Sequence, residues 1–146
     1  MRAIIQRVSS ASVSVAGEII GSIEEGLVVL LGIEANDSPQ DLEWIAEKIV
    51  AQRLFGAWDQ SVVERGGGIL LISQFTLHAS TRKGTKPSWH RAAKPDLALP
   101  LYETMVNRLS ALLGRPIQTG KFGAAMQVTL TNDGPVTVML DSKLRE

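Results

Sequence analysis

The chain has 146 residues, and its 15 Lys and Arg residues balance 15 Asp and Glu residues, giving a formal net charge of zero. This length suits a single domain, residues 1–146, with a core of its own. The neutral balance gives no sign of a broadly basic surface for nucleic acid. The chain has no Cys and two His, which excludes disulfides and a thiol nucleophile and indicates neither a metal site nor another cofactor.

The start of the chain carries no predicted targeting signal. Gln6 and Arg7 stand where a secretory signal needs an uninterrupted apolar run. The longest apolar stretch, residues 27–31, is far too short to cross a membrane. We therefore expect a cytoplasmic protein that makes no contact with membranes.

The first third of the chain reads as strands followed by a helix. Residues 3–8 are rich in β-forming side chains, and residues 12–15 alternate as a half-buried strand does. Residues 26–33 are almost continuously apolar, which predicts a strand buried on both faces. Ser38 and Pro39 then begin a helix that we expect to reach about residue 54.

The rest of the chain alternates in the same way. The apolar run 69–75 predicts another buried strand, and a helix is expected over about residues 97–113, where Pro100 is tolerable only in the first turn. Strands over 126–131 and 136–140 are separated by a predicted turn. The pattern predicts a single α/β domain: a mixed sheet or barrel-like β layers with two main helices packed on one side, a three-layer α/β/β arrangement.

Charge is segregated along the chain. Eight acids and no base lie between Arg7 and Lys48, whereas the segment from His78 to Lys94 contains five bases and no acid. One interpretation is two solvated faces of opposite sign. The other is a local site for an anionic ligand, with Trp89 stacking on a base while cations meet phosphates. On the second interpretation Arg82, Lys83 and Lys86 bind the anionic ligand.

The polar segment Ser73-Gln74-Phe75-Thr76 ends the buried strand 69–75. Polar groups are costly there unless they are paired, and ligand sites form at strand ends in α/β sheets. Ordinary strand-end hydrogen bonding is the alternative explanation. Ser or Thr as a nucleophile needs an activating base, and only His78 and His90 could supply an imidazole.

The segment Asn132-Asp133-Gly134-Pro135 reads first as a hairpin turn. Pro directly after the turn glycine does not suit a tight hairpin, because it cannot donate to the strand ladder. A Gly-Pro bond has an appreciable tendency to be cis, which would aim two carbonyls in one direction. The alternative hypothesis is therefore a rigid backbone probe that senses the shape of a ligand.

Taken together, these segments resemble the D-aminoacyl-tRNA deacylases. The S-Q-F-T-L motif at 73–77 and the N-D-G-P-V-T motif at 132–137 correspond to the two signatures of that family. Flanking matches, including residues 3–8 and 119–124, extend the resemblance over essentially the whole chain. One departure is the segment 56–60, which is shorter here than the family's usual hairpin.

The resemblance implies a homodimer that hydrolyses the ester between a D-amino acid, or glycine, and the terminal ribose of tRNA, with active sites at the subunit interface. A cis dipeptide from one subunit would enter the pocket of the other, hold the α-amino group with its carbonyls and exclude an L side chain. The implied catalytic segment is Ser73, Gln74, Phe75 and Thr76. The residues implied in substrate binding and chiral selection are Gly134, Pro135, Arg7, Phe122 and Met126.

The mechanism favoured from the sequence uses no nucleophilic side chain. The protein would position the ester, backbone N–H groups near Phe75 and Thr76 would polarise its carbonyl, and the 2′-hydroxyl of the substrate would help to activate water. Two other readings stay open: a serine- or threonine-type esterase acting on another substrate, and a non-catalytic module that binds tRNA.

Overall fold

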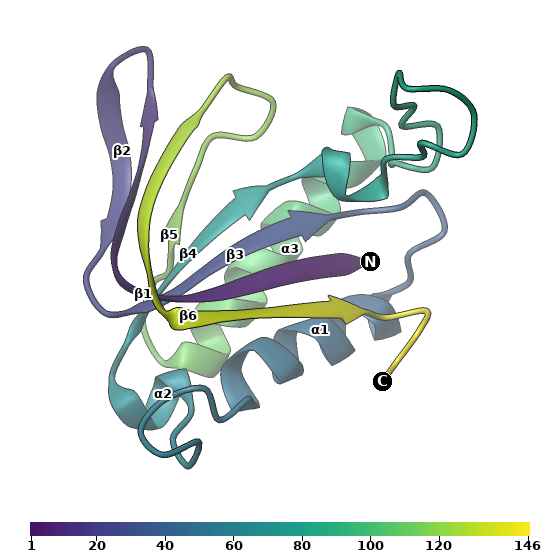
Figure 1. Cartoon of the computed structure of the whole chain (residues 1–146). Helices are drawn as coiled ribbons and strands as arrows, with labels where there is room; N and C mark the ends of the chain where they lie inside the picture. The colour runs from purple at the N-terminus through teal and green to yellow at the C-terminus, as the bar shows by residue number, and fades with distance from the viewer.

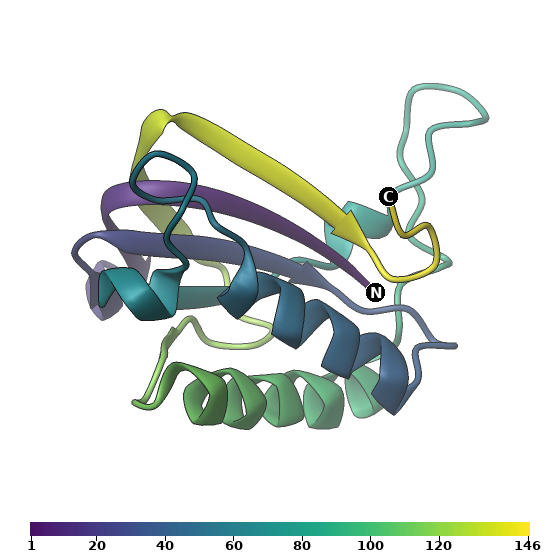
Figure 2. The same cartoon turned by 90° about the horizontal axis from the view of Figure 1, so that it is seen from below.

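The computed structural model describes all 146 residues as one mixed sheet with helices on one face. The main helices α1 (Pro39–Ala51) and α3 (Pro95–Leu113) lie side by side beneath the sheet in Figure 2. The shorter helices are α2 (Val62–Arg65) and the one-turn η1 (Phe75–His78). The strands are β1 (Arg2–Val15), β2 (Glu18–Ile23), β3 (Gly26–Gly32), β4 (Gly68–Ser73), β5 (Gln118–Thr119) and β6 (Gln127–Asp141).

The strands run in the order β2-β1-β3-β4-β5, and β6 pairs with β1. The β3–β4 and β4–β5 pairs are parallel and the others are antiparallel. Because β1 is long, its first half pairs with β3 and β6 and its second half pairs with β2 and β6. The bent strands β1 and β6 thus carry the sheet around toward closure, as Figure 1 shows.

Two apolar clusters correspond to the two faces of this sheet. The larger cluster of 25 buried residues joins the sheet to α1 and α3. The smaller cluster of seven includes Val13, Val28 and Leu70, on the face that β1, β2 and β6 enclose. The predicted three-layer α/β/β arrangement is confirmed, and β3 is buried almost throughout because both clusters draw on it.

Local chemistry explains where α1 begins. Ser38 accepts a hydrogen bond from the Asp41 amide at 3.2 Å, and the Asp41 carboxylate accepts one from the Ser38 amide at 2.8 Å. This reciprocal pair satisfies two amide donors that a helix start leaves free. The helix ends at Ala51, three residues before the predicted end, because Gln52 turns into an extended conformation.

The expected position of Pro100 was wrong. Helix α3 begins at Pro95, so Pro100 lies inside the helix instead of in its first turn. Pro100 has no N–H to donate to the carbonyl of Asp96, and Asp96 is an exposed residue. None of the helices is long and apolar enough to cross a lipid bilayer.

The chain does not reverse at Asn132–Pro135, so the predicted turn there was also wrong. β6 is continuous, and it pairs with β1 on both sides of this segment, through Val8 with Asn132 and Gln6 with Thr137. The register shift leaves the intervening residues bulged out of the ladder. Pro135 has no N–H to donate, and the Val136 amide donates instead to the Asn132 side chain at 3.2 Å.

Candidate functional site

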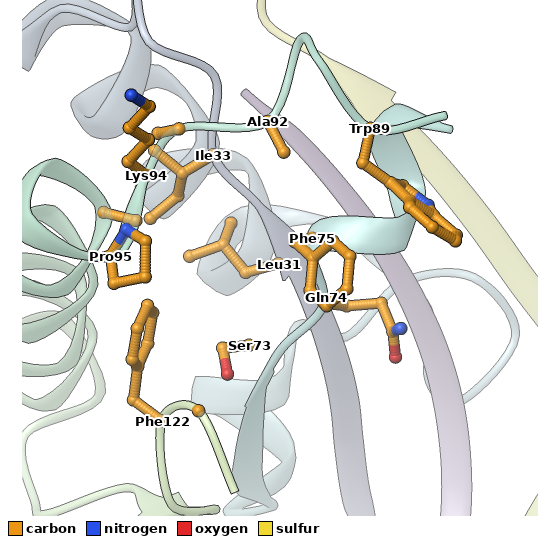
Figure 3. A pocket seen from close by; sticks show the side chains of 13 residues that line it. Leu31, Ile33, Ser73, Gln74, Phe75, Trp89, Ala92, Lys94, Pro95 and Phe122 are labelled. Atoms are coloured by element: carbon orange, nitrogen blue, oxygen red, sulfur yellow. The ribbon is translucent and has the colours of Figure 1, made fainter. Parts of the chain in front are cut away.

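A cavity of about 400 Å³ opens at the carboxyl ends of the parallel strands β3 and β4. Strand ends of this kind are where α/β sheets bind ligands. In Figure 3, Ser73 and Leu31 lie between Phe122 and Pro95 on one side and Phe75 on the other. The lining residues are Leu31, Ile33, Ser73, Gln74, Phe75, Trp89, Ala92, Ala93, Lys94, Pro95, Ala98, Phe122 and Gly123.

The strand register positions the polar segment at this cavity. Ser73 is the last residue of β4 and lies beside Leu31 of β3. The Gln74 amide donates to the Leu31 carbonyl at 2.7 Å, after which the chain leaves the sheet and forms η1. Phe75 is 57% exposed and packs edge-on against Trp89, with ring centroids 5.6 Å apart. The predicted strand therefore ends two residues early, and Phe75 is free to line the cavity.

The opposite side of the cavity is fixed by Phe122 and the start of α3. The Tyr102 hydroxyl donates to the Leu71 carbonyl at 3.0 Å, and its ring lies 5.7 Å from that of Phe122. Burial raises the pKa of Tyr102 to about 12, so its phenol stays protonated at neutral pH. Tyr102 thus acts as a fixed apolar support for Phe122.

Residues 92–95 cross the cavity because two contacts tie them to the end of β3. The Ala93 amide donates to the Ile33 carbonyl at 2.9 Å. Arg91 forms an ion pair with the buried Glu34 at 2.6 Å. These contacts hold the segment between the basic loop and α3 against the sheet.

Neither histidine provides an obvious base for Thr76. Thr76 is exposed, lies outside the cavity lining, and its hydroxyl accepts a hydrogen bond from the Gln74 side chain. His78 is fully buried, and burial lowers its pKa despite Glu34 at 3.6 Å. His90 lies 3.3 Å from the Ser88 hydroxyl.

Met126, expected to line the pocket, also lies outside the cavity. It packs against the smaller apolar cluster, next to Gly120. A β-carbon on Gly120 would lie 2.5 Å from the Met126 sulfur, so glycine is what lets the two segments approach. Phe122 is the one of this predicted pair that lines the cavity.

The bulge in β6 forms a second groove of about 370 Å³, lined by Arg7, Trp58 and residues 134–138. The Gly134–Pro135 peptide bond is cis. Arg7 donates to the Leu54 carbonyl at 2.6 Å and to the Asp133 carbonyl at 3.2 Å, and pairs with the Asp133 carboxylate at 3.3 Å. Arg7 therefore braces the segment that precedes the dipeptide.

The cavity and the groove lie at opposite ends of the sheet in one chain. Arg7 is beside Leu27 at the start of β3, whereas Ser73 is beside Leu31 near its end. Four residues of strand span about 13 Å, and Figure 1 shows the bend of β6 far from the segment that follows β4. The structure brings Ser73, Gln74, Phe75 and Phe122 together, but it does not bring Gly134 and Pro135 to them.

The predicted tRNA-binding cations lie on a loop beyond η1. Arg82, Lys83 and Lys86 are all exposed. The loop is closed at its base by mutual backbone hydrogen bonds between Ser80 and Ser88, at 2.8 and 3.0 Å. It projects from the body of the molecule at the cavity end of the sheet (Figure 1).

Sequence reasoning missed two parts of this site. The cavity lining from residues 92–95 and Ala98 depends on how α3 packs, and no local pattern signals that. Trp58, which lines the groove, could have been found from the sequence. A large ring in a short turn segment has no core to fill, and that is a signal for a residue outside the core. No group of three or more His, Asp or Glu side chains is placed to hold a metal ion.

The fold and the site define a class: α/β proteins with an apolar pocket at parallel strand ends and a separate glycine-proline bulge. The sequence matches the family described as D-Tyr-tRNA(Tyr) deacylase over residues 4–141. The chain belongs to this D-aminoacyl-tRNA deacylase family, as its sequence motifs suggested.

Named relatives match over the full length of both chains. The chain is 57% identical to a D-aminoacyl-tRNA deacylase of Opitutus terrae and 53% identical to one of Dechloromonas aromatica, each over 150 aligned positions covering 100% of both proteins. A solved structure described as c-Myc DNA unwinding element binding protein is 41% identical, with a TM-score of 0.92 over 97% of this chain and 98% of that one. A probable eukaryotic D-amino acid tRNA deacylase shares the fold at 16% identity, with a TM-score of 0.84 over 95% and 97% of the two chains.

Proposed function

We propose that this protein hydrolyses the ester bond of D-aminoacyl-tRNA and releases the free D-amino acid and the tRNA. The family membership supports the reaction, and one observation carries the geometry. A hollow at the strand ends and a projecting backbone dipeptide lie at opposite ends of the same sheet. Neither is a complete site for an ester and its α-amino group, and each supplies what the other lacks.

A second copy of the chain would complete the site. The sheet face turned away from the helices carries contiguous apolar groups: Met139 is 69% exposed, and Ile4 and Leu30 beside it are half-buried. Burial of such a strip favours a homodimer. In a two-fold dimer the dipeptide of each subunit would enter the partner's cavity, which makes two equivalent active sites.

Chiral selection would come from the backbone of Gly134 and Pro135. Their carbonyls would hold the α-amino group, and the dipeptide would occupy the space that an L side chain needs. Arg7, fixed by Leu54 and Asp133, would keep this barrier in place. A steric barrier rejects the wrong enantiomer without a specific grip on the right one, so achiral glycyl-tRNA would also be a substrate.

The chemistry would depend on positioning more than on a side-chain nucleophile. The start of η1 receives no side-chain cap, so the first backbone amides, on Phe75 and Thr76, are available to polarise an ester carbonyl. The substrate's 2′-hydroxyl would then help to activate the attacking water. Lys83 and its neighbours on the loop beside the cavity would hold the phosphates at the acceptor end of the tRNA. The reaction would take place in the cytoplasm, where aminoacyl-tRNA is used.

The first experiment compares release of tyrosine from D-Tyr-tRNA and L-Tyr-tRNA. We expect rapid release from the D substrate alone, and we expect Pro135→Ala to release tyrosine from the L substrate as well. Salt-sensitive tRNA binding with no release would instead identify a binding module. Covalent labelling of Ser73 or Thr76 by an organophosphonate would identify a serine- or threonine-type esterase.

The second experiment tests the shared site by mixing two variants that each damage a different half of it. One carries Ser73→Ala and Gln74→Ala, and the other carries Gly134→Ala and Pro135→Ala. Subunit exchange at equal amounts would create one intact site in each mixed dimer, so release from D-Tyr-tRNA should rise above that of either variant alone, toward about a quarter of the wild-type rate. Mixtures no faster than the average of the two variants, although mass spectrometry detects mixed dimers, would show that the site is not shared.

A further inference from the structure

Arg91 differs from the other bases of the basic stretch because it has an acidic partner. Its guanidinium lies 2.6 Å from the carboxylate of Glu34, an acid whose side chain is only 8% exposed. None of the other four bases in this stretch forms an ion pair. A cation that a close acid neutralises offers less attraction to a phosphate, so the position of Arg91 calls for another explanation.

Glu34 needs this partner, because burying a carboxylate is costly unless a cation is close. Two other groups face its side chain: the Met1 amino group at 4.0 Å and the His78 Nδ1 atom at 3.6 Å. Burial lowers the pKa of His78, so that ring is neutral at neutral pH. Arg91 is therefore the closest positive charge to Glu34, and the pair holds the chain around Arg91 near the end of β3.

The pair joins the end of β3 to the segment 89–95. Ala92 forms an antiparallel bridge with Glu34, and the Ala93 amide donates to the Ile33 carbonyl at 2.9 Å. The segment supplies five of the 13 residues that line the cavity: Trp89, Ala92, Ala93, Lys94 and Pro95. Figure 3 shows the labelled members of this set along one side of the cavity. That side therefore depends on an ion pair whose two members do not line the cavity themselves.

We propose that Glu34 and Arg91 are positioning residues, and that their ion pair holds the segment 89–95 where it contacts the substrate in the cavity. This inference rests on the proposed function, which places the aminoacyl end of the tRNA there. The other explanation of Arg91 is a direct contact with a tRNA phosphate. The two explanations predict opposite effects of removing the charge of Glu34: a phosphate-binding Arg91 would be freed for its ligand, whereas a positioning Arg91 would lose its anchor.

The pair acts on substrate binding more than on the chemical step. The backbone amides of Phe75 and Thr76, which the proposed function assigns to the ester carbonyl, belong to η1. η1 has its own attachment to the sheet, because the Gln74 amide that precedes it donates to the Leu31 carbonyl at 2.7 Å. Loss of the ion pair therefore raises KM and leaves kcat nearly unchanged, as expected when an interaction stabilises the bound substrate and the transition state equally.

The first test measures kcat and KM for D-Tyr-tRNA with Glu34→Gln, which removes the charge and keeps the size of the side chain. We expect KM to rise about fivefold and kcat to stay within about twofold, although a negative charge near an anionic substrate has been removed. The control is Glu25→Gln, which removes the same charge from an ion pair with Arg65, 2.7 Å long, just before β3. Its KM should match the wild type. An unchanged or lower KM in Glu34→Gln would overturn the inference.

The second test removes the other member of the pair and varies the salt concentration. Arg91→Met changes a side chain that is 48% exposed, so the fold should tolerate it. KM should rise by a similar factor, while the slope of log KM against log salt should stay as in the wild type, because Arg91 binds no phosphate. Lys83→Met, on the exposed loop, should flatten that slope by about one. Equal flattening in both variants would overturn the inference, and Arg91→Lys, which keeps the cation, should keep most of the wild-type KM.

Hydrogen exchange followed by mass spectrometry tests the pair without any activity. Peptides that contain Ala93 should exchange faster in Glu34→Gln than in the wild type or Glu25→Gln, because the segment opens more often once its anchor is lost. Unchanged exchange would overturn the inference. A wild-type protein that releases no amino acid from any D-aminoacyl-tRNA would instead refute the proposed function, whatever the exchange rates, so the two failures are distinguishable.

Discussion

Gly134→Ala tests whether the bulge in β6 is as tightly built as the site requires. Gly134 has a φ of +125°, a conformation that L residues rarely adopt. A β-carbon there would lie 2.8 Å from the Val136 side chain and 3.1 Å from a guanidinium nitrogen of Arg7. Val136 is buried, and Arg7 is held by two carbonyls, so neither neighbour can move freely.

The cost has two parts. The backbone conformation contributes about 2 kcal/mol, and the close contact with Val136 adds about 1 kcal/mol. The free energy of unfolding should therefore fall by about 3 kcal/mol, which corresponds to a Tm lower by about 10 °C for a chain of this size. A domain of ordinary stability remains folded at 20 °C after such a loss, so activity can still be measured.

The control is Gly17→Ala, because Gly17 also has a positive φ, +82°, but no atom lies within 4 Å of the added carbon. It should cost only about 1 kcal/mol and leave deacylation intact, whereas Gly134→Ala should lower kcat/KM for D-Tyr-tRNA at least tenfold. Urea unfolding and a deacylation assay check both variants. Equal stability losses in the two variants, or full activity in Gly134→Ala, would refute this account of the bulge.

Three further outcomes are expected. Thr76→Ala should keep substantial deacylation of D-Tyr-tRNA. Near-total loss of deacylation in a folded variant that still binds tRNA would instead identify Thr76 as the nucleophile. Lys83→Glu should weaken tRNA binding, measured by filter binding at low salt, more than Lys48→Glu on the exposed face of α1; equal effects would remove the loop from the binding surface. Burial lowers the pKa of His78, so the unfolded chain takes up a proton at a higher pH than the folded chain. Stability should therefore fall between about pH 7 and 5, and His78→Phe should abolish that fall in urea unfolding; an unchanged pH profile would contradict it.

Local signals predicted the elements that local chemistry determines. The start of α1 was predicted from Ser38 and Pro39, and two hydrogen bonds between Ser38 and Asp41 stabilise it. The apolar run at β3 predicted burial on both faces, which the two clusters confirm. Such features depend on residues a few positions apart, so a sequence displays them directly.

Features that depend on distant pairing were missed. Asn132–Pro135 has the composition of a turn, yet β1 continues to pair with β6 on both sides of it. A long partner strand decides between a turn and a bulge, and composition does not show that partner. Likewise, Thr76 was expected in the pocket because it follows a buried strand, but it lies in η1 and is not among the residues that line the cavity.

The backbone of Gly134 and Pro135 would act on one property of the substrate alone. A steric barrier there would act on configuration at the α-carbon and would be indifferent to the rest of the amino acid. Arg7 donates to the carbonyl of Asp133, the residue before Gly134, so the barrier would depend on a side chain outside it. Pro135→Ala should therefore relax chirality without changing the order of D substrates. Arg7→Ala should relax chirality as well, because it removes the support of the segment that precedes the dipeptide. Release of tyrosine from L-Tyr-tRNA measures both effects, and unchanged rejection of the L substrate by Arg7→Ala would show that the barrier does not need Arg7.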